Sequence, residues 1–335
     1  MKKETSIFKY DNEINNILDI AYGFQKSRVL LTAHELNIFN ILGDISKSAK
    51  EVSEEIPANK DAVERLLNAL VGMRIIDKEG NRYSNTRTGY SLLIRDNPNY
   101  MACLDHINNL SKSWSDLTEA VREGKPAGLD GSTIRSEEDL NKFISAMNWR
   151  AAKIAPELVK MLNLKNIETV IDIGCGSGAL GMEMLKVNPN IELTLFDYPE
   201  VMKIANKHVE RKSLTGIVKS LEGDLLNDNI GSGYDLVLMS QVLHAYSIWD
   251  NLTILNKVFS AMNHGGTLVV HEYILDENRI TPEYNALFSL NMLIHTSGGN
   301  VMTENDLWML FKETLFSDFK RVDTNFGTSL LFGKR

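Results

Sequence analysis

The sequence predicts an α/β protein, with a mostly α-helical domain followed by a parallel sheet that helices cover on both faces. From Glu168 onward, short apolar runs alternate with segments of helical period, which is typical of parallel strands joined by crossover helices. Before that residue, apolar positions recur mainly at helical spacing. We expect a first domain over residues 1–100, a helical connector over 101–165 that contributes to a substrate pocket, and an α/β domain over 166–335.

The N-terminal hundred residues combine helices with one hairpin. Two apolar series, from Ile14 to Ala21 and from Val29 to Ile41, indicate two packed helices. Asn59 follows a proline and is suited to cap the next helix. The turn Asp77–Asn81 separates two short apolar runs and predicts a hairpin. Helices followed by a hairpin form the winged-helix arrangement.

Charge weighs against a nucleic-acid partner. Residues 1–100 contain 14 Lys plus Arg and 14 Asp plus Glu, and the whole chain has a formal net charge of -8. Because binding DNA by counterion release requires a basic surface, we favour homodimer formation through this domain. A ligand-sensing, DNA-binding regulator is the alternative.

The composition also disfavours a membrane protein, an exported protein and a metalloprotein. No run of 18 apolar residues occurs, and the first residues lack the apolar core of a signal peptide. The two cysteines, Cys103 and Cys175, lie far apart and have no metal-ligand spacing. We expect a cytoplasmic protein that binds no metal.

The α/β domain should carry its ligand at one edge of the sheet. The expected parallel strands are residues 169–173, 191–196, 216–221, 234–239 and 267–273, and residues 319–322 and 329–332 are expected to form a closing pair. Right-handed crossovers leave a crevice at the carboxyl ends of such strands, where ligands bind.

A glycine turn follows the first of these strands. Gly174, Gly176 and Gly178 allow the backbone to bend sharply and to approach a ligand closely. Gly174, Gly176 and Ala179 also satisfy the dinucleotide fingerprint, so an NAD-dependent oxidoreductase is a second alternative.

Acidic residues help to distinguish a site for a dinucleotide from a site for an adenosine that carries a positive charge. Asp172 lies inside the first strand, where a charge is costly unless a cation such as an ammonium or a sulfonium is near. Asp197 and Asp224 end the next two strands and can accept hydrogen bonds from a ribose and an adenine, or else cap the following helices. Three acids at successive strand ends favour S-adenosyl-L-methionine.

Several motifs carry a family resemblance that runs nearly from end to end. They are VIDIGCGSG, LFDYPEV, EGDLL, VLH, HGGTLVVHEYIL and FSLNMLIHTSGGNVMTENDL. In these motifs the chain resembles the two-domain O-methyltransferases of plant phenylpropanoid and bacterial polyketide or phenazine pathways. The resemblance implies a Rossmann-like class I methyltransferase domain behind a winged-helix dimerisation domain, S-adenosyl-L-homocysteine as product, and a small aromatic hydroxyl acceptor. The cofactor contacts expected with it are Asp172, Gly174, Gly176, Gly178, Asp197, Asp224, Leu225 and Ser240.

A histidine is the expected general base. A phenol of pKa about 10 is mostly protonated at neutral pH, so a base of pKa about 6.5 assists its methylation. His244 follows the fourth strand and matches the base of the family, and Glu272 matches an acid that can orient the imidazole. The chain departs from the family at Ala245 and Val301, where most members have an aspartate and many have a glutamate. Proton removal by a base and catalysis by proximity alone both remain open.

The expected acceptor-binding residues are mainly aromatic side chains and methionines, which suit flat apolar rings. They match pocket-lining segments of the family at Phe143, Met147, Trp149, Phe288, Asn291, Met292 and His295. Packing in the hydrophobic core is the alternative role for each of them.

Overall fold

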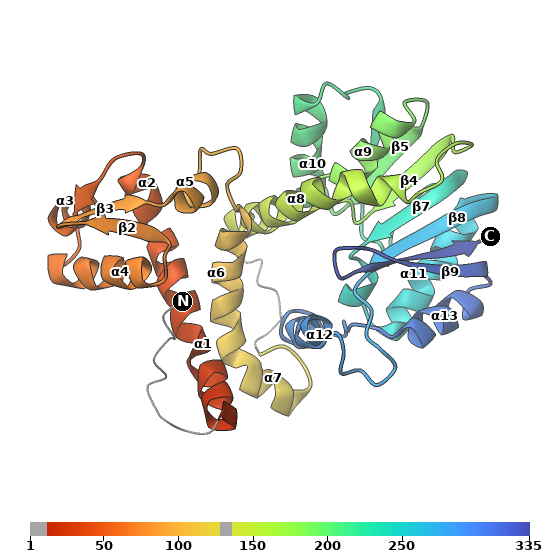
Figure 1. The fold of residues 1–335 in the computed structure, drawn as a ribbon. Coiled ribbons are helices and arrows are strands. Elements are labelled where there is room, and N and C mark those ends of the chain that lie inside the picture. Colours follow the sequence, from red (N-terminus) through yellow and green to blue (C-terminus); the bar gives the residue numbers. More distant parts are fainter. Residues whose placement is uncertain (1–11, 128–135) are drawn as a thin grey trace. The chain divides into compact units, whose positions relative to one another are not determined.

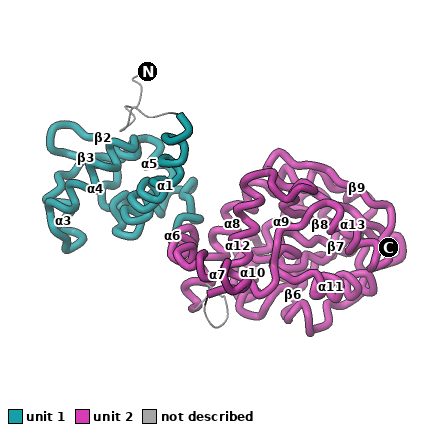
Figure 2. The backbone as a smooth tube through the Cα atoms, turned by 90° about the horizontal axis from the view of Figure 1, so that it is seen from below, with its two compact units in different colours: residues 1–104 teal, residues 105–335 magenta. Residues whose placement is uncertain are grey.

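The computed structural model describes residues 12–127 and 136–335. The chain divides into two compact units, residues 1–104 and residues 105–335 (Figure 2).

The first unit combines helices with a small antiparallel sheet of strand order β1-β3-β2 (Figure 1). Its elements are α1 (Asn12–Glu35), α2 (Ile38–Leu42), β1 (Lys47–Ser48), α3 (Ala49–Glu55), α4 (Lys60–Gly72), β2 (Ile76–Glu79), β3 (Arg82–Asn85) and α5 (Arg87–Leu93). The predicted hairpin is confirmed, because Ile76 pairs with Asn85 and Glu79 with Arg82. Asn59 caps α4 as expected, accepting a hydrogen bond from the Ala62 amide at 3.0 Å.

The predicted boundary between the two helices before residue 41 is wrong. The continuous helix α1 contains the first apolar series and the second series as far as Ala33, whereas Leu36 follows α1 and Ile41 lies on the short α2. No proline interrupts residues 12–35, and the single glycine, Gly23, is tolerated within a helix. The chain breaks at Asn37 instead, which adopts a left-handed conformation with φ 59°.

The second unit is built on a seven-stranded sheet of order β6-β5-β4-β7-β8-β10-β9. Its strands are β4 (Thr169–Ile173), β5 (Glu192–Asp197), β6 (Val218–Glu222), β7 (Tyr234–Ser240), β8 (Met262–Glu272), β9 (Ser317–Asp323) and β10 (Ser329–Lys334). β4 to β8 pair in parallel, whereas β10 pairs antiparallel with both β8 and β9. The predicted parallel sheet and its closing pair are therefore confirmed.

Helices connect and flank these strands (Figure 1). They are α6 (Cys103–Ser113), η1 (Trp114–Asp116), α7 (Leu117–Glu123), α8 (Glu137–Lys160), α9 (Ala179–Val187), α10 (Pro199–Arg211), η2 (Leu243–Ala245), α11 (Ile248–Ala261), α12 (Glu283–His295) and α13 (Glu304–Glu313). α6 begins at the boundary between the two units.

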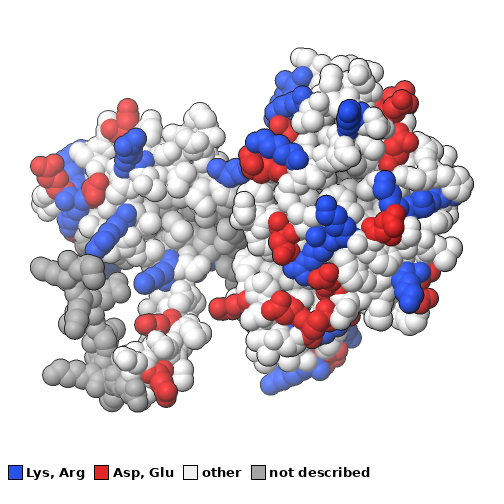
Figure 3. Space-filling model, turned by 45° about the vertical axis from the view of Figure 1, so that its right-hand side comes forward, with Lys and Arg blue, Asp and Glu red and all other residues white. Residues whose placement is uncertain are grey.

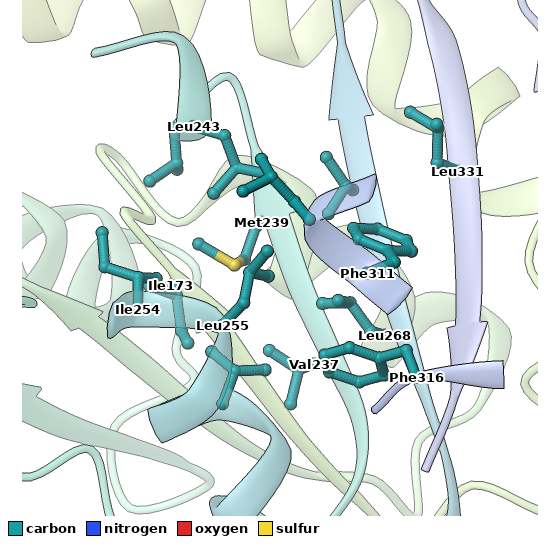
Figure 4. Close-up of a cluster of buried hydrophobic side chains, with 14 of the residues drawn as sticks. Ile173, Val237, Met239, Leu243, Ile254, Leu255, Leu268, Phe311, Phe316 and Leu331 are labelled. Atoms are coloured by element: carbon teal, nitrogen blue, oxygen red, sulfur yellow. The ribbon is translucent and has the colours of Figure 1, made fainter. Parts of the chain in front are cut away.

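Two hydrophobic clusters hold helices to opposite faces of the sheet. On one face, Ile173 and Met239 pack with residues of α11 and α13 such as Leu255 and Phe311 (Figure 4). On the other face, a separate cluster joins the strands to α8, α9 and α10. Successive strand residues point to opposite faces, so both faces of the parallel sheet are dry.

In-register pairing aligns the carboxyl ends of the central strands. Ile173 lies opposite Phe196 on β5 and Met239 on β7, and Ser240 lies opposite His271 on β8. The residues that follow these positions therefore meet at one edge of the sheet.

Candidate active site

The glycine turn leaves β4 and enters α9 with three residues of positive φ. Gly174, Gly176 and Gly178 have φ values of 65°, 55° and 73°. A Cβ atom added at Gly174 would lie 2.6 Å from Val242 Cγ2, so this residue is confined by its neighbour. A Cβ atom added at Gly176 would meet no atom within 4 Å. The turn is thus tightly packed at its start and open at its middle.

The Asp172 carboxylate lies beneath this turn. It is 1% exposed, and its Oδ2 accepts a hydrogen bond of 3.0 Å from the Gly181 amide in the first turn of α9. Burial raises the pKa of Asp172 to about 7, although the Gly181 amide opposes that rise and nearby Asp197 adds to it. The protein thus holds a costly carboxylate at the amino end of a helix, where the helix dipole favours a negative charge.

Asp197, at the end of β5, ties the second strand to the glycine turn. Its Oδ2 accepts a hydrogen bond from the Gly176 amide at 2.8 Å, and its Oδ1 accepts one from the Tyr198 amide at 2.8 Å. Burial raises the pKa of Asp197, and these two amides partly oppose the rise. This carboxylate therefore contacts the glycine turn and does not cap α10, since α10 begins without a side-chain cap.

Asp224 lies in the loop after β6. Its Oδ1 accepts a hydrogen bond from the Leu226 amide at 2.9 Å, and its Oδ2 accepts one from Asn227 Nδ2 at 2.6 Å. No helix of the described chain begins directly after it, so it shapes a turn instead of capping a helix. Leu225 beside it is 4% exposed and belongs to the hydrophobic cluster under the sheet.

Ser240 ends β7 and contacts a buried histidine. Its hydroxyl lies 2.8 Å from Nδ1 of His271, whose Nε2 lies 2.8 Å from the Thr328 hydroxyl on the far side. Burial lowers the pKa of His271 to about 4, so this imidazole is neutral at physiological pH. No pattern in the sequence predicts these polar contacts among β7, β8 and the residue before β10.

His244 and Glu272 form a close pair at the ends of β7 and β8. Nδ1 of His244 lies 2.7 Å from Glu272 Oε2, and the two residues are 8% and 1% exposed. Because a carboxylate oxygen accepts hydrogen bonds, Nδ1 is the ring nitrogen that donates to Glu272, and Nε2 takes no part in this contact. The contact with Glu272 orients the imidazole ring.

Aromatic rings pack beside this imidazole. The Phe288 ring lies edge-on to His244 at 5.0 Å between centroids, and the Tyr273 ring lies 4.9 Å from Phe288. Tyr284 on α12 lies 5.3 Å from Tyr273. Arg150 on α8 donates a hydrogen bond to the Tyr273 hydroxyl.

The other expected acceptor residues lie on α8 and α12. The Phe143 ring lies edge-on to His106 at 5.2 Å, and Asn291 Oδ1 accepts a hydrogen bond of 3.1 Å from Trp114 Nε1. Met147 and Trp149 are half-buried and Met292 is buried. Within the described chain, Trp149 Nε1 and His295 Nε2 are buried and have no hydrogen-bond partner.

Ala245 and Val301, the two departures from the family motifs, differ in their burial. Ala245 is exposed in η2, and Val301 is buried against Tyr273 and Leu275. A Cβ atom added at Gly299 would lie 2.3 Å from the His244 carbonyl oxygen, so the loop before Val301 closely contacts the histidine turn. Glu272 is thus the acid that contacts this histidine.

Three further residues contact this part of the structure and were not predicted from the sequence. His106 and Arg150 lie among the expected acceptor residues, and the helical spacing of Phe143, Met147 and Arg150 was the available signal for the arginine. Lys257 on α11 had no signal in the sequence. Its ammonium donates to the carbonyl oxygens of Leu225, Leu226 and Asp228 at 2.7, 3.0 and 2.6 Å.

Comparisons with known proteins identify the family. The chain matches the model of the O-methyltransferase domain over residues 114–317 and that of the O-methyltransferase dimerisation domain over residues 18–95. Acetylserotonin O-methyltransferase of Gallus gallus is 30% identical, in an alignment covering 87% of this chain and 86% of the relative. A 3-hydroxy-5-methyl-1-naphthoate 3-O-methyltransferase of Streptomyces sahachiroi is 27% identical over 85% of this chain and 84% of its own.

A solved structure agrees with these sequence matches. Human N-acetylserotonin methyltransferase in complex with S-adenosylmethionine superposes with a TM-score of 0.87, at 27% identity, covering 98% of this chain and 99% of the human chain. The fold and the site define a class I methyltransferase preceded by a helical dimerisation domain. The chain belongs to the O-methyltransferase family, and it is an S-adenosylmethionine-dependent O-methyltransferase.

The alternative functions find no support in these matches, neither the DNA-binding regulator nor the NAD-dependent oxidoreductase. Basic and acidic side chains are interspersed over the face of the molecule seen in Figure 3. No helix within residues 12–127 and 136–335 combines the length and apolar character that a membrane span requires. The same residues include no group of three or more His, Cys, Asp or Glu side chains arranged to hold a metal ion.

We predict that Lys257→Met weakens the binding of S-adenosylhomocysteine about tenfold, because the loop after β6 loses three charge-assisted hydrogen bonds while the apolar stem is kept. Isothermal titration calorimetry measures the dissociation constant. Lys312→Met, which alters an exposed lysine on α13, is the control and should bind like the parent. Equal affinities of the Lys257→Met variant and the parent would show that the three carbonyl contacts do not support the cofactor site.

Proposed function

We propose that this enzyme methylates a hydroxyl group on a small aromatic acceptor, with His244 as the general base and Glu272 as the residue that orients it. The observation that carries the proposal is the 2.7 Å contact between His244 Nδ1 and Glu272 Oε2, which leaves Nε2 as a proton acceptor beside the Phe288 ring. The rings of Phe288, Tyr273 and Tyr284 offer apolar faces suited to a flat acceptor. A relative named for a hydroxynaphthoate supports the aromatic class.

The glycine turn and the acids around it fit the cofactor. The open space at Gly176 is where a Cβ atom would lie, so a ligand can contact this backbone directly. We assign Asp172, Gly174, Gly176, Gly178, Asp197, Asp224, Leu225 and Ser240 to cofactor binding. In this assignment Asp197 accepts from the ribose hydroxyls, Asp224 accepts from the adenine amino group, and Asp172 favours the ammonium of the amino-acid end.

The chemistry needs little from the protein beyond position and one proton acceptor. S-Adenosylmethionine supplies a methyl group on a sulfonium, whose sulfur leaves with the bonding electrons as a neutral thioether. His244 Nε2 takes the proton of the acceptor hydroxyl while its oxygen forms the new bond to carbon. Glu272 then stabilises the resulting imidazolium through Nδ1. Phe143, Met147, Trp149, Phe288, Asn291, Met292 and His295 are assigned to the acceptor side of the site.

We predict that His244→Gln lowers kcat about 10²-fold to 10⁴-fold, because glutamine cannot accept the acceptor's proton, and leaves the affinity for S-adenosylhomocysteine unchanged. Transfer of a labelled methyl group to the best substrate in a panel of phenols measures the rate. His264→Gln, at an exposed histidine, is the matched control. A His244→Gln enzyme as active as the parent would rule out the base role and would indicate catalysis by proximity alone.

The raised pKa of Asp172 yields a second test. The ammonium of S-adenosylhomocysteine favours the ionised carboxylate, so a group of pKa about 7 should release about half a proton on binding at pH 7. We therefore expect S-adenosylhomocysteine to bind more tightly at pH 8 than at pH 6. Calorimetry in buffers of different ionisation enthalpy measures the release, and Asp172→Asn, which can still accept from Gly181, should abolish it. Proton release that survives in this variant would assign it to another group.

We also infer that the first unit, interpreted as a winged-helix domain, forms a homodimer. It contains the dimerisation-domain match, and α1 presents Ile17, Ile20 and Phe24 with 68%, 81% and 65% of their surface exposed. Exposed apolar side chains at this density mark a surface that another chain covers. Light scattering should give twice the chain mass of 37.7 kDa, and a monomer at micromolar concentration would refute the inference.

A further inference from the structure

Arg150 is a cation whose contacts in the described chain do not include a carboxylate. It lies on α8, on the helical face that carries Phe143 and Met147. Its hydrogen-bond partners within residues 12–127 and 136–335 are the hydroxyls of Tyr273 and Tyr284, and burial raises the pKa of Tyr273. A guanidinium has five N–H donors, so Arg150 retains donors that these two phenols do not use.

The ring cluster connects this cation to the proposed base. The Arg150 guanidinium carbon lies 5.9 Å from the Tyr273 ring, that ring lies 4.9 Å from Phe288, and Phe288 lies 5.0 Å from His244. These contacts place the cation and the proposed base on one continuous aromatic cluster, so two substituents of one aromatic acceptor can address the two groups.

The neighbouring imidazoles do not supply this charge. Burial lowers the pKa of His106 to about 4, and the nearby His295 and Arg150 lower it further. Burial also lowers the pKa of His295. Its Nδ1 lies 2.8 Å from the Asn291 carbonyl oxygen, which only accepts, so Nδ1 carries the proton and the buried Nε2 is an unused acceptor. At neutral pH, Arg150 is the charged member of this group of three.

We propose that Arg150 binds a carboxylate on the acceptor, so that the preferred substrate is an aromatic hydroxy acid. The guanidinium matches a carboxylate through two parallel hydrogen bonds, a geometry that neither lysine nor a neutral donor reproduces. The Tyr273 and Tyr284 hydroxyls orient the arginine but do not neutralise its charge. The carboxylate of the acceptor would neutralise it. This inference rests on the proposed function, because it concerns the acceptor side of the same site.

Matched acceptor pairs test the proposal by binding rather than turnover. The probes are hydroxybenzoates and hydroxynaphthoates, each compared with the carboxamide of the same ring, titrated into the full chain saturated with S-adenosylhomocysteine. For the tightest pair we expect the parent to bind the carboxylate at least about tenfold more tightly than the carboxamide. Arg150→Met should abolish this preference, and Arg150→Lys should keep only part of it.

A control and two readouts separate recognition from a structural role. Lys160→Met removes a cation at the exposed end of the same helix, where it pairs with Glu157, and should keep the full preference. Equal affinities of the parent for acid and amide, no binding of either at millimolar concentration, or an equal loss for both in Arg150→Met would overturn the proposal. An Arg150-dependent preference in a protein whose His244→Gln variant stays active would retain the subsite and reject only the base.

Discussion

Parallel pairing of β4 with its neighbours is the constraint on which the whole site depends. The register places Ile173 beside Phe196 and Met239, so the chain segments that leave these strands begin at one edge. Both faces of the sheet are packed against helices, and a slip of one residue would turn buried side chains toward the wrong face. The positions of the acids, the glycine turn and the histidine are consequences of that register.

Much of this architecture was predictable because it depends on local periodicity. The parallel strands, the hairpin and the cap at Asn59 follow from apolar spacing and turn chemistry. The length of α1 was not predicted, since a helix that contains one apolar series and the start of the next resembles two helices when no partner surface is known. The sequence also allowed us to predict which residues follow the strand ends. It did not allow us to predict the hydrogen-bond partner of each of these side chains.

The partners of Asp172 and Ser240 illustrate that limit. Asp172 bonds the Gly181 amide nine residues away, which depends on how closely α9 approaches β4. Ser240 contacts a histidine 31 residues later, across a strand pair. The environments of the histidines differ for the same reason: His244 contacts a carboxylate, His271 lies between two hydroxyls, and His106 lies against a phenylalanine. Residue type alone does not distinguish an oriented base from a neutral structural imidazole.

The close approach of Gly299 to the histidine turn limits how this enzyme can diversify. The loop after α12 contacts the backbone of His244 where no side chain fits, so the helix that carries the residues proposed to bind the acceptor is linked through this loop to the turn at His244. Because this contact leaves no spare room, a shift of α12 to admit a bulkier ring would also have to move the loop at Gly299 against the His244 backbone. New acceptor ranges are therefore more accessible by exchanging side chains along a stationary helix than by relocating it.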